Sequence, residues 1–316
     1  MVTVGIDLGG TNIYAVVLDG EEAVGRAKLR TPATGERTEV LDVIDAAVRD
    51  ALDDAGHSLD DVEGVGVGSP GIVMAGTVGG ASNVPGFLER FSLADLLKQK
   101  VGRDVRVTND VTAAAIAEHR LGAGRGTADV LGIHVGTGVG GGIILDGKPF
   151  EGGAGGAGEF GHIVVAMGGA VCTCGRRGCV EAYAGRRAME LAAERALAAG
   201  TPTILFDVMR ERNKPRATSG IFKEAHDRGD PLVADLLDGA IEALGAGIAS
   251  AVNLLDVDVV VLGGGLADKF GEWFRMRVDA AMRPHLFLQP PRVRVVSAEL
   301  GDEGGAIGAA LLAAGD

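Results

Sequence analysis

The sequence predicts an α/β fold, and three observations support this prediction. Stretches with the two-residue period of strands alternate with stretches that have the 3.6-residue period of helices. Glycine is abundant, at 52 of 316 residues, against a usual share of about 7%, but it follows no collagen-like period. The segment at residues 4–20 is partly repeated at residues 131–147. Together these features indicate alternating strands and helices with many tight backbone turns.

The first half contains five expected strands and three expected helices. The strands are expected at residues 2–8, 12–19, 22–30, 62–67 and 105–108. The helix at 37–54 shows five apolar residues at helical spacing, a second helix starts at the capping-box pattern Ser92-Leu93-Ala94-Asp95, and an alanine-rich helix is expected at 111–120.

The second half of the chain also alternates expected strands and helices. Its strands are expected at residues 129–135, 139–146, 257–262 and 293–298. Its helices are expected at residues 180–199, 231–254 and 267–282 and from Gly304 onward.

The two similar segments read VGIDLGGTNIYAVVLDG and LGIHVGTGVGGGIILDG. Each is a strand, a Gly/Thr turn, a second strand and an Asp-Gly turn. They are either unrelated hairpins with common turn residues or copies from a duplicated domain. In the second case, each hairpin tip would expose backbone N–H groups that can hold phosphate oxygens. Two such tips facing a shared cleft would grip a polyphosphate from both sides.

The amino-acid composition disfavours some classes of binding partner. The 43 acidic and 30 basic side chains give a net charge of −13, which disfavours nucleic-acid binding. No apolar run approaches the roughly 20 residues that span a bilayer, and the N-terminus lacks the basic region of a signal peptide. We therefore expect a cytoplasmic protein that binds neither nucleic acid nor a membrane.

All three cysteines lie in the run VCTCGRRGC, as Cys172, Cys174 and Cys179. An odd number cannot form a closed set of disulfides, and thiolates this close together suit tetrahedral Zn²⁺. His162 is the candidate fourth ligand. The alternatives are a surface loop of reactive thiols, or a redox pair with one spare thiol. A closed set of four ligands indicates structural zinc, which would position the neighbouring carboxylates Glu159 and Glu181 and leave one imidazole N–H free.

These features together resemble the ROK family of sugar kinases and repressors, in the actin-like ATPase superfamily, and most closely its glucokinase branch. The matching segments span nearly the whole chain, and the CxCGxxGCxE run after ExGH is the most specific. They are DLGGTN at residues 7–12, ND at 109–110, GTGVGGG at 136–142, EFGH at 159–162, CTCGRRGCVE at 172–181 and LGGG at 262–265.

The resemblance implies two actin-like (ribonuclease H-like) domains with a cleft between them. We expect a small domain at residues 1–120, on which the last helix (about 303–316) packs, and a large domain at 121–316 that carries the zinc loop at 162–179. The implied reaction is Mg²⁺-assisted transfer of a phosphoryl group from ATP to a hexose, most simply glucose. A homo-oligomer, dimer or tetramer, is also implied.

Other functions remain open at this point. The substrate could be N-acetylmannosamine, fructose, mannose or allose, and polyphosphate could replace ATP. A sugar-responsive repressor of the same family would need a helix-turn-helix module, which we do not expect because DLGGTN begins at residue 7. A catalytically inactive sugar-binding protein is disfavoured by Asp7, Asp110, Glu159 and Glu181.

By resemblance, Asp110 is the general base that accepts the proton of the attacking sugar hydroxyl. Taken alone, an aspartate between a strand and an alanine-rich helix would be read as a helix N-cap. The remaining sugar-binding residues implied by the family are Gly71, Asn83, Asn109, Glu159, His162 and Glu181. Simple turns at Gly71 and Asn83, and a solvated carboxylate in the first turn of a helix at Glu181, are the alternatives.

The nucleotide site is also implied by the family. Asp7 would position Mg²⁺, whereas the second copy of the hairpin has His134 at that place. There is no P-loop sequence. The expected ATP-binding residues are Asp7, Gly9, Gly10, Thr11, Asn12, Thr137, Gly138, Gly264 and Gly265. The glycine triplet at 263–265 could equally be a tight turn. The run from Gly152 to Gly158 has no assigned role beyond an expected mobile segment that leads to Glu159.

Overall fold

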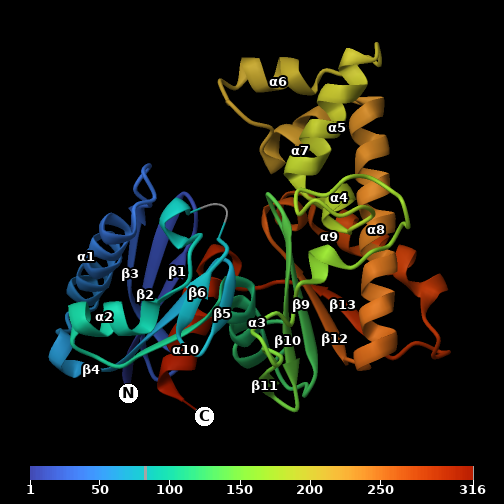
Figure 1. The fold of residues 1–316 in the computed structure, drawn as a ribbon. Helices are drawn as coiled ribbons and strands as arrows, with labels where there is room; N and C mark the ends of the chain where they lie inside the picture. The colour runs from blue at the N-terminus through green and yellow to red at the C-terminus, as the bar shows by residue number, and fades with distance from the viewer. Residues whose placement is uncertain (82–83, 316) are drawn as a thin grey trace. The chain divides into compact units, whose positions relative to one another are not determined.

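The computed structural model describes residues 1–81 and 84–315 and has the predicted α/β architecture (Figure 1). The chain divides into two compact units. One comprises Met1–Gly132, Gly142–Gly158 and Glu299–Asp316, and the other comprises Ile133–Gly141 and Glu159–Ala298. Within the described residues, no helix is long and apolar enough to cross a membrane.

The first unit is built on a five-stranded sheet with the order β3-β2-β1-β4-β8. Strand β2 pairs antiparallel with β1 and β3, while β4 pairs parallel with β1 and β8. The strands are β1 (Val2–Leu8), β2 (Asn12–Asp19), β3 (Glu22–Arg30), β4 (Val62–Ser69) and β8 (Val105–Asn109). All five were predicted within two residues of these bounds.

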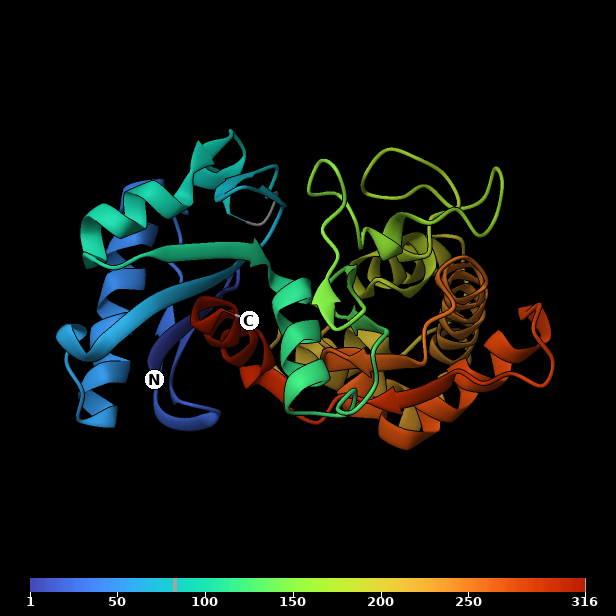
Figure 2. The same cartoon turned by 90° about the horizontal axis from the view of Figure 1, so that it is seen from below.

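Alternation along β1 assigns its two faces to different helices. Val4, Ile6 and Leu8 share a hydrophobic core with residues of α1 (Arg37–Ala55). The opposite face packs on α10 (Gly304–Ala314), which also contacts β4 and α3 (Asp110–Arg120). Figure 2 shows α10 lying between this sheet and α3. Asp7 therefore shares the α10 face of β1, since it is two residues from Gly5.

Glycine inside the strands lets α10 approach the sheet closely. A Cβ on Gly5 would lie 1.9 Å from the carbonyl oxygen of Ala306, and one on Gly66 would lie 1.8 Å from that of Ala309. On the other side of α10, a Cβ on Gly308 would meet the Ala113 carbonyl at 1.7 Å. Real Cβ atoms do not come so close to backbone atoms. Part of the glycine excess therefore supports packing and not ligand binding.

A buried carboxylate ties the chain before α10 to α3. Glu118 is 3% exposed, and its oxygens accept hydrogen bonds from three backbone N–H groups. The donors are Ala123 N at 2.9 Å, Glu299 N at 2.9 Å and Leu300 N at 2.8 Å. The segment that leads into α10 is thus anchored through one side chain.

A small antiparallel sheet and a short helix complete the first unit. The sheet has the order β5-β6-β7 and was not predicted. Helix α2 begins after Ser92, whose Oγ accepts from Asp95 N at 3.2 Å, so the predicted cap is confirmed. These elements are β5 (Ile72–Met74), β6 (Thr77–Gly79), β7 (Phe91–Ser92) and α2 (Leu93–Val101).

The second five-stranded sheet repeats the strand order of the first. Its order is β11-β10-β9-β12-β13, so in both sheets the strands run third, second, first, fourth and fifth along the chain. The strands are β9 (Val130–Val135), β10 (Val139–Leu145), β11 (Lys148–Pro149), β12 (Val259–Gly263) and β13 (Arg294–Ser297). This shared topology favours the duplicated-domain interpretation of the two similar segments.

The helices of the second unit differ from the prediction in two places. The single helix expected at 180–199 is two helices, because Gly185 has extended backbone angles (φ −67°, ψ 128°). Helices α6 and α7 were not predicted. Helix α9 packs on β12, β13 and α8. The helices are α4 (Glu181–Ala184), α5 (Arg186–Ala198), α6 (Leu205–Glu211), α7 (Ser219–Asp227), α8 (Pro231–Leu255) and α9 (Gly265–Met282).

Candidate active site and metal centre

The first hairpin tip joins β1 to β2 and is held by backbone contacts. Gly9 N donates to Asn12 O at 3.0 Å, and the Thr31 hydroxyl donates to Gly9 O at 2.6 Å. Thr31 N also donates to Thr11 O at 3.0 Å. Gly10 and Thr11 are exposed at the tip. The turn is thus fixed to the end of β3 and presents its backbone to solvent, as a phosphate-binding turn requires.

Asp7 lies just before this turn, in an acidic environment. Desolvation by the surrounding protein is the largest cause that raises its pKa to about 7, and the charges of Asp110 and Asp302 raise it further. A Cβ on Gly305, in the first turn of α10, would lie 2.8 Å from Asp7 Cγ. The helix backbone therefore approaches the carboxylate closely. A site that crowds carboxylates together favours a bound cation.

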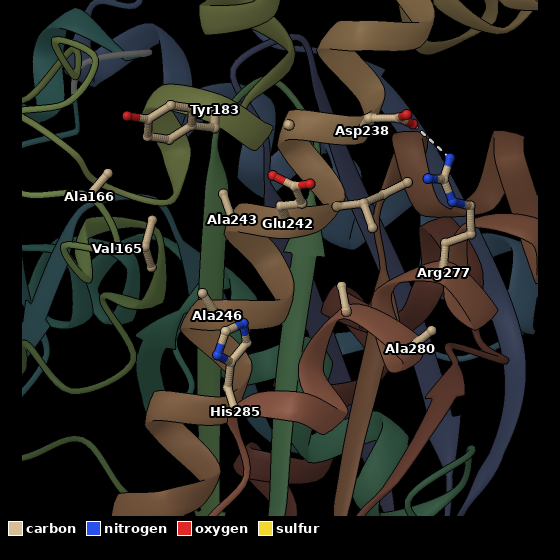
Figure 3. A pocket seen from close by; sticks show the side chains of 13 residues that line it. Val165, Ala166, Tyr183, Asp238, Glu242, Ala243, Ala246, Arg277, Ala280 and His285 are labelled. Atoms are coloured by element: carbon tan, nitrogen blue, oxygen red, sulfur yellow. Dashed lines mark hydrogen bonds and ion pairs between the residues drawn. The ribbon is translucent and has the colours of Figure 1, made fainter.

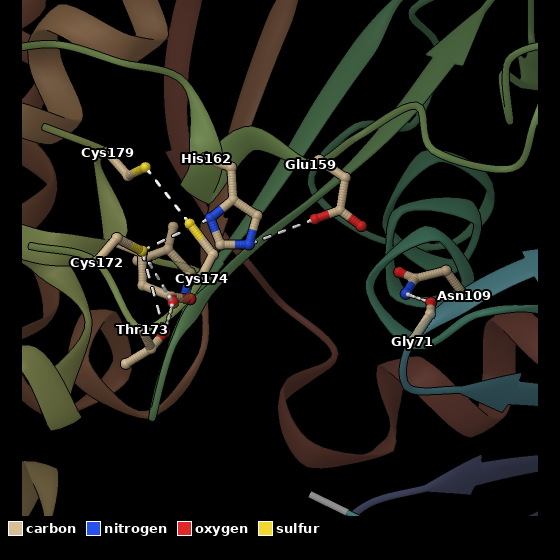
Figure 4. Close-up of polar contacts among 10 residues, drawn as sticks. Gly71, Asn109, Glu159, His162, Cys172, Thr173, Cys174 and Cys179 are labelled. Carbon is tan, nitrogen blue, oxygen red and sulfur yellow. Dashed lines mark hydrogen bonds and ion pairs between the residues drawn. The ribbon is translucent and has the colours of Figure 1, made fainter. Parts of the chain in front are cut away.

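Asn109 and Asp110 stand where β8 meets α3, and Asn109 is the N-cap. Its Oδ1 accepts from Val111 N at 2.9 Å and from Thr112 N at 3.3 Å, while its Nδ2 donates to Gly71 O at 3.2 Å (Figure 4). The N-cap interpretation of Asp110 is therefore wrong, because the preceding residue fills that position. Asp110 is the first residue of α3, where the helix dipole favours a negative charge.

Gly71 adopts a left-handed conformation, with φ of +88°. A Cβ there would lie 2.5 Å from Gly79 O, on the neighbouring strand β6. The Asn109 amide thus links the α3 N-terminus to a turn that only glycine can form without strain. The predicted sugar-binding residues Gly71, Asn109 and Asp110 are brought together in the first unit. Asn83, also predicted, lies outside the described residues.

The second hairpin tip, between β9 and β10, is closed by a bond from Gly136 N to Gly138 O at 2.9 Å. Glu181 lies against this turn. Its Oε2 accepts from Val139 N at 3.0 Å, and a Cβ on Gly138 would lie only 2.4 Å from that oxygen. Its Oε1 accepts from the Thr173 hydroxyl at 2.8 Å. The alternative of a solvated helix carboxylate is therefore wrong, since Glu181 joins the hairpin tip to the cysteine loop.

The His/Cys cluster has the geometry of a tetrahedral metal site. One ligand atom from each of His162, Cys172, Cys174 and Cys179 lies within 4.8 Å of the others. Cys174 Sγ and Cys179 Sγ are 3.9 Å apart, and Cys172 Sγ is 3.8 Å from His162 Nδ1. A zinc–sulfur distance of about 2.3 Å at tetrahedral angles requires sulfur atoms about 3.8 Å apart. The four residues therefore fit Zn²⁺.

His162 presents one nitrogen to each of two environments (Figure 4). Nδ1 faces the sulfur of Cys172, and Nε2 lies 3.8 Å from Glu159 Oε2. A metal bound through Nδ1 would leave the proton on Nε2, on the side of Glu159. This arrangement agrees with the expectation that the metal loop orients one imidazole N–H and a neighbouring carboxylate.

The glycines at 263–265 form the connection from β12 to α9. Gly264 has φ of +87°, and a Cβ there would lie 2.7 Å from Val135 N. A Cβ on Gly263 would lie 2.9 Å from Nε2 of His134. Desolvation lowers the pKa of His134 to about 4, so this counterpart of Asp7 is neutral near pH 7. The two hairpins are thus alike in shape but not in charge.

The run from Gly152 to Gly158 contacts the small sheet of the first unit. A Cβ on Gly155, which has φ of +70°, would lie 1.9 Å from the Val73 carbonyl in β5. Nearby, the Thr108 hydroxyl donates to Glu151 Oε1 at 2.8 Å. Gly155 therefore needs to be glycine for close packing against β5, whereas a Cβ on Gly153 or Gly156 would meet nothing within 4 Å.

One cavity of the second unit has no part in this set of residues. It encloses about 680 Å³ beside α8 and α9, and the ion pair of Asp238 with Arg277, at 2.7 Å, lies on its wall (Figure 3). None of the predicted site residues that the structure describes lines it. Its walls combine small apolar side chains with the charged pair Asp238 and Arg277, and we do not assign the chemistry to it.

One residue near the second hairpin tip was missed from the sequence. Arg186 opens α5 and donates from Nη2 to Thr137 Oγ1 at 2.8 Å and from Nη1 to Ser219 Oγ at 3.1 Å. In the sequence it appears as one arginine in the helical pattern of 180–199. Only the break at Gly185, which places it at a helix start, could have singled it out.

The comparisons with known proteins agree with this arrangement. The model of the ROK family matches residues 3–316, and the chain therefore belongs to the ROK family. A glucokinase of Streptomyces coelicolor is 34% identical over 98% of this chain and 97% of its own. Two solved structures are also similar over nearly their whole length. A ROK hexokinase from Thermus thermophilus has a TM-score of 0.84 at 35% identity, covering 99% of this chain and 98% of its own. A ROK glucokinase from Streptomyces griseus, in complex with glucose and AMPPNP, has a TM-score of 0.83 at 36% identity and full coverage of both chains.

Proposed function

We propose that this protein is an ATP-dependent sugar kinase that converts glucose to glucose 6-phosphate. The observation that carries the proposal is the full-length likeness, in sequence and fold, to a glucokinase whose structure holds glucose and an ATP analogue. The sequence relatives named glucokinase, at 34% identity, support the same activity. Of the residues proposed for the site, Asn109, Asp110 and Glu181 lie at starts of helices in the described structure, which supports the proposal.

In this proposal Asp110 is the general base. It is the first residue of α3, and in this proposal its carboxylate accepts the proton from the sugar hydroxyl. Asn109 and Gly71, which are bonded to each other, bind the sugar together with Asn83. From the second unit, Glu159, His162 and Glu181 bind the remaining hydroxyl groups.

The donor phosphates bind the two Gly/Thr turns, and the adenosine binds at Gly264 and Gly265. Asp7, with Asp110 and Asp302 near it, supplies the oxygen ligands that Mg²⁺ prefers. When bound there, Mg²⁺ would neutralise charge on the transferred phosphoryl group. These carboxylates repel one another, and a bound Mg²⁺ would offset that repulsion. This is the feature of the chain that supports a magnesium site here.

Zn²⁺ has a structural role in this proposal. The set of one histidine and three cysteines closes the coordination sphere, so no position remains for substrate. The metal holds the loop that leads into Glu181, and His162 Nε2 is left free to act on the sugar side. We further propose that the protein forms homo-oligomers.

A coupled assay of ADP release tests the activity, with ATP as donor and a panel of hexoses as acceptors. Asp110→Ala should reduce kcat by about 100-fold or more, while glucose binding, measured by calorimetry, weakens much less. Asp53→Ala, at an exposed position of α1, is the matched control and should behave as the wild type. Phosphorylation of no hexose by the wild-type protein would overturn the proposal.

A second candidate substrate class is the N-acetylhexosamines. A kinase for N-acetylgalactosamine from a Shewanella species is 32% identical over 98% of this chain, and an N-acetylmannosamine kinase of Vibrio cholerae is 31% identical over 92%. Adding both amino sugars to the panel separates the two classes. A kcat/KM higher for either of them than for glucose would assign the protein to the second class. Polyphosphate belongs in the donor panel, because a polyphosphate/ATP-glucomannokinase is 25% identical with a TM-score of 0.63.

A further inference from the structure

Arg186 is a cation with neutral partners, placed at the second hairpin tip. Its guanidinium bonds the hydroxyls of Thr137 and Ser219. Within the described part of the second unit, it forms no ion pair with a carboxylate. Arg186 is partly buried, and desolvation is the largest cause that lowers its pKa. A desolvated charge without a counter-ion is unfavourable, so this site favours an anionic ligand.

The charges around Arg186 compensate for it only in part. The carboxylate whose charge acts on Arg186, the buried Glu190, is shared by two other arginines. Its Oε2 lies 2.9 Å from Arg187 Nη1 and 3.3 Å from Arg216 Nε. Glu190 Oε1 also accepts from Ala217 N at 3.1 Å. Arg187 has a second carboxylate, Glu194 Oε1, at 3.9 Å. Arg186 therefore shares the charge of Glu190 with two arginines that are directly paired to it, and the positive charge of Arg216 adds to the lowering of its pKa.

The backbone holds Arg186 firmly against the Gly/Thr turn. Arg186 N donates to Gly136 O at 3.0 Å, and Arg187 N donates to Thr137 O at 3.1 Å. The turn thus caps the start of α5. Thr137 itself is exposed, so a ligand can reach the turn. A guanidinium has five N–H donors, and those not used by the two hydroxyls can bind a phosphate oxygen pair.

The adenosine side of the site is near as well. Ser219 is the second hydroxyl bound by Arg186, and its Oγ would lie 3.2 Å from a Cβ on Gly265 at the start of α9. Arg186 therefore connects the turn expected to bind phosphates with the turn expected to bind adenosine. No other described residue of this turn region carries a positive charge with two neutral hydroxyl partners.

We propose that Arg186 binds a phosphate group of the nucleotide donor and positions it on the turn at residues 136–138. This inference rests on the proposed function, since it names a donor-binding residue of the same kinase site. It predicts that the guanidinium discriminates between donors by their phosphate charge and has little influence on the sugar.

Steady-state kinetics of Arg186→Gln provide the first test. Losing one charge-assisted contact to a phosphate should raise KM for ATP by about 10- to 100-fold, with KM for glucose changed by less than about twofold. Arg186→Lys keeps the positive charge but lacks the planar set of donors of a guanidinium, so its KM for ATP should be intermediate. Arg195→Gln is the matched control, because Arg195 is exposed on the same helix. An unchanged KM for ATP in Arg186→Gln would overturn the proposal.

A structural role for Arg186 predicts a different pattern. Arg186 could simply fasten the turn to α7 through Ser219, and then Arg186→Gln would disturb the whole nucleotide site. Equilibrium binding separates the two roles without turnover. If Arg186 binds phosphate, Arg186→Gln weakens ATP binding but leaves adenosine binding unchanged, and Ser219→Ala leaves ATP binding within about threefold of the wild type. Equal losses for ATP and adenosine would refute phosphate binding.

These measurements also separate the inference from the proposed function. If the wild-type protein phosphorylates no hexose, the proposed function fails, yet ATP and pyrophosphate binding to wild type and Arg186→Gln still test Arg186. If the wild type is an active kinase and Arg186→Gln binds ATP as tightly as the wild type, only the inference about Arg186 fails.

Discussion

Replacing Asp7 by asparagine should make the ligand-free protein more stable at neutral pH. Desolvation and the charges of Asp110 and Asp302 raise the pKa of Asp7 from 3.8 to about 7. In the unfolded chain the pKa returns to about 3.9. Between these two values the folded protein binds more protons than the unfolded protein, so its stability falls as the pH rises. An asparagine side chain carries no charge, and the Asp7→Asn variant should therefore escape this loss.

The size of the expected gain in stability follows from the pKa shift of Asp7. About three pH units at 1.36 kcal/mol per unit give an upper bound of about 4 kcal/mol. Asp7 retains some solvent exposure, which reduces this to about 2 to 4 kcal/mol. The full amount is lost only above pH 7. Near pH 5 the wild-type side chain is mostly protonated in the folded state, and the advantage of Asp7→Asn should be smaller.

Thermal unfolding at pH 5 and pH 8, without divalent cations, measures this difference. The Tm of Asp7→Asn should exceed that of the wild type by several degrees at pH 8 and by clearly less at pH 5. Asp53→Asn, on the exposed face of α1, should show no such pH-dependent gap. A variant that is less stable than the wild type at pH 8, or a gap equal at both pH values, would refute the reasoning. In our proposal the same variant also loses kinase activity, because Mg²⁺ loses a ligand.

Three further predictions concern other parts of the molecule. Cys174→Ala should reduce bound zinc from about one ion per chain to much less, measured by elemental analysis after dialysis; retention of the full amount would contradict the four-ligand site. Glu118→Ala leaves three backbone N–H groups without an acceptor and should lower the free energy of unfolding by about 3 to 5 kcal/mol in urea titrations; a loss below about 1 kcal/mol would argue against the anchoring role. Gly138→Ala should lower kcat by about 10- to 100-fold because its methyl group displaces Glu181. Gly136→Ala, whose Cβ would meet nothing within 4 Å, is its control, and equal effects in the two variants would show that Glu181 is not displaced.

The regular elements were largely predictable because their periods are strong. Strand β4 alternates valine with glycine, β1 alternates large apolar residues with Thr3, Gly5 and Asp7, and α1 carries a continuous apolar face. The two sheets with the same strand order follow from a repeat that is visible in the sequence. The metal cluster was predictable for another reason, because closely spaced thiols separated by glycines have few alternative uses.

Other features depend on contacts that no local pattern reveals. The N-cap of α3 is Asn109 and not Asp110. The Asn109 side chain accepts from Val111 N and also donates a hydrogen bond to the Gly71 carbonyl, which is distant in sequence. The break between α4 and α5 arises where Gly185 turns beneath the second hairpin tip; a Cβ there would lie 3.4 Å from Thr137 O. The role of Arg186 follows from that break. In each case a residue distant in sequence decides between two locally acceptable structures.

The placement of α10 has a consequence for the order in which the protein folds during synthesis. The first unit receives residues 1–132 early, but α10, which packs against β1, β4 and α3, is synthesised after every other described element of the two units. Until then Gly5 and Gly66 on that face of the sheet lack the helix that packs against them. The second unit has all its residues available by Ala298. We therefore expect the second unit to fold first on the nascent chain, and the first unit to be completed only when α10 has been synthesised.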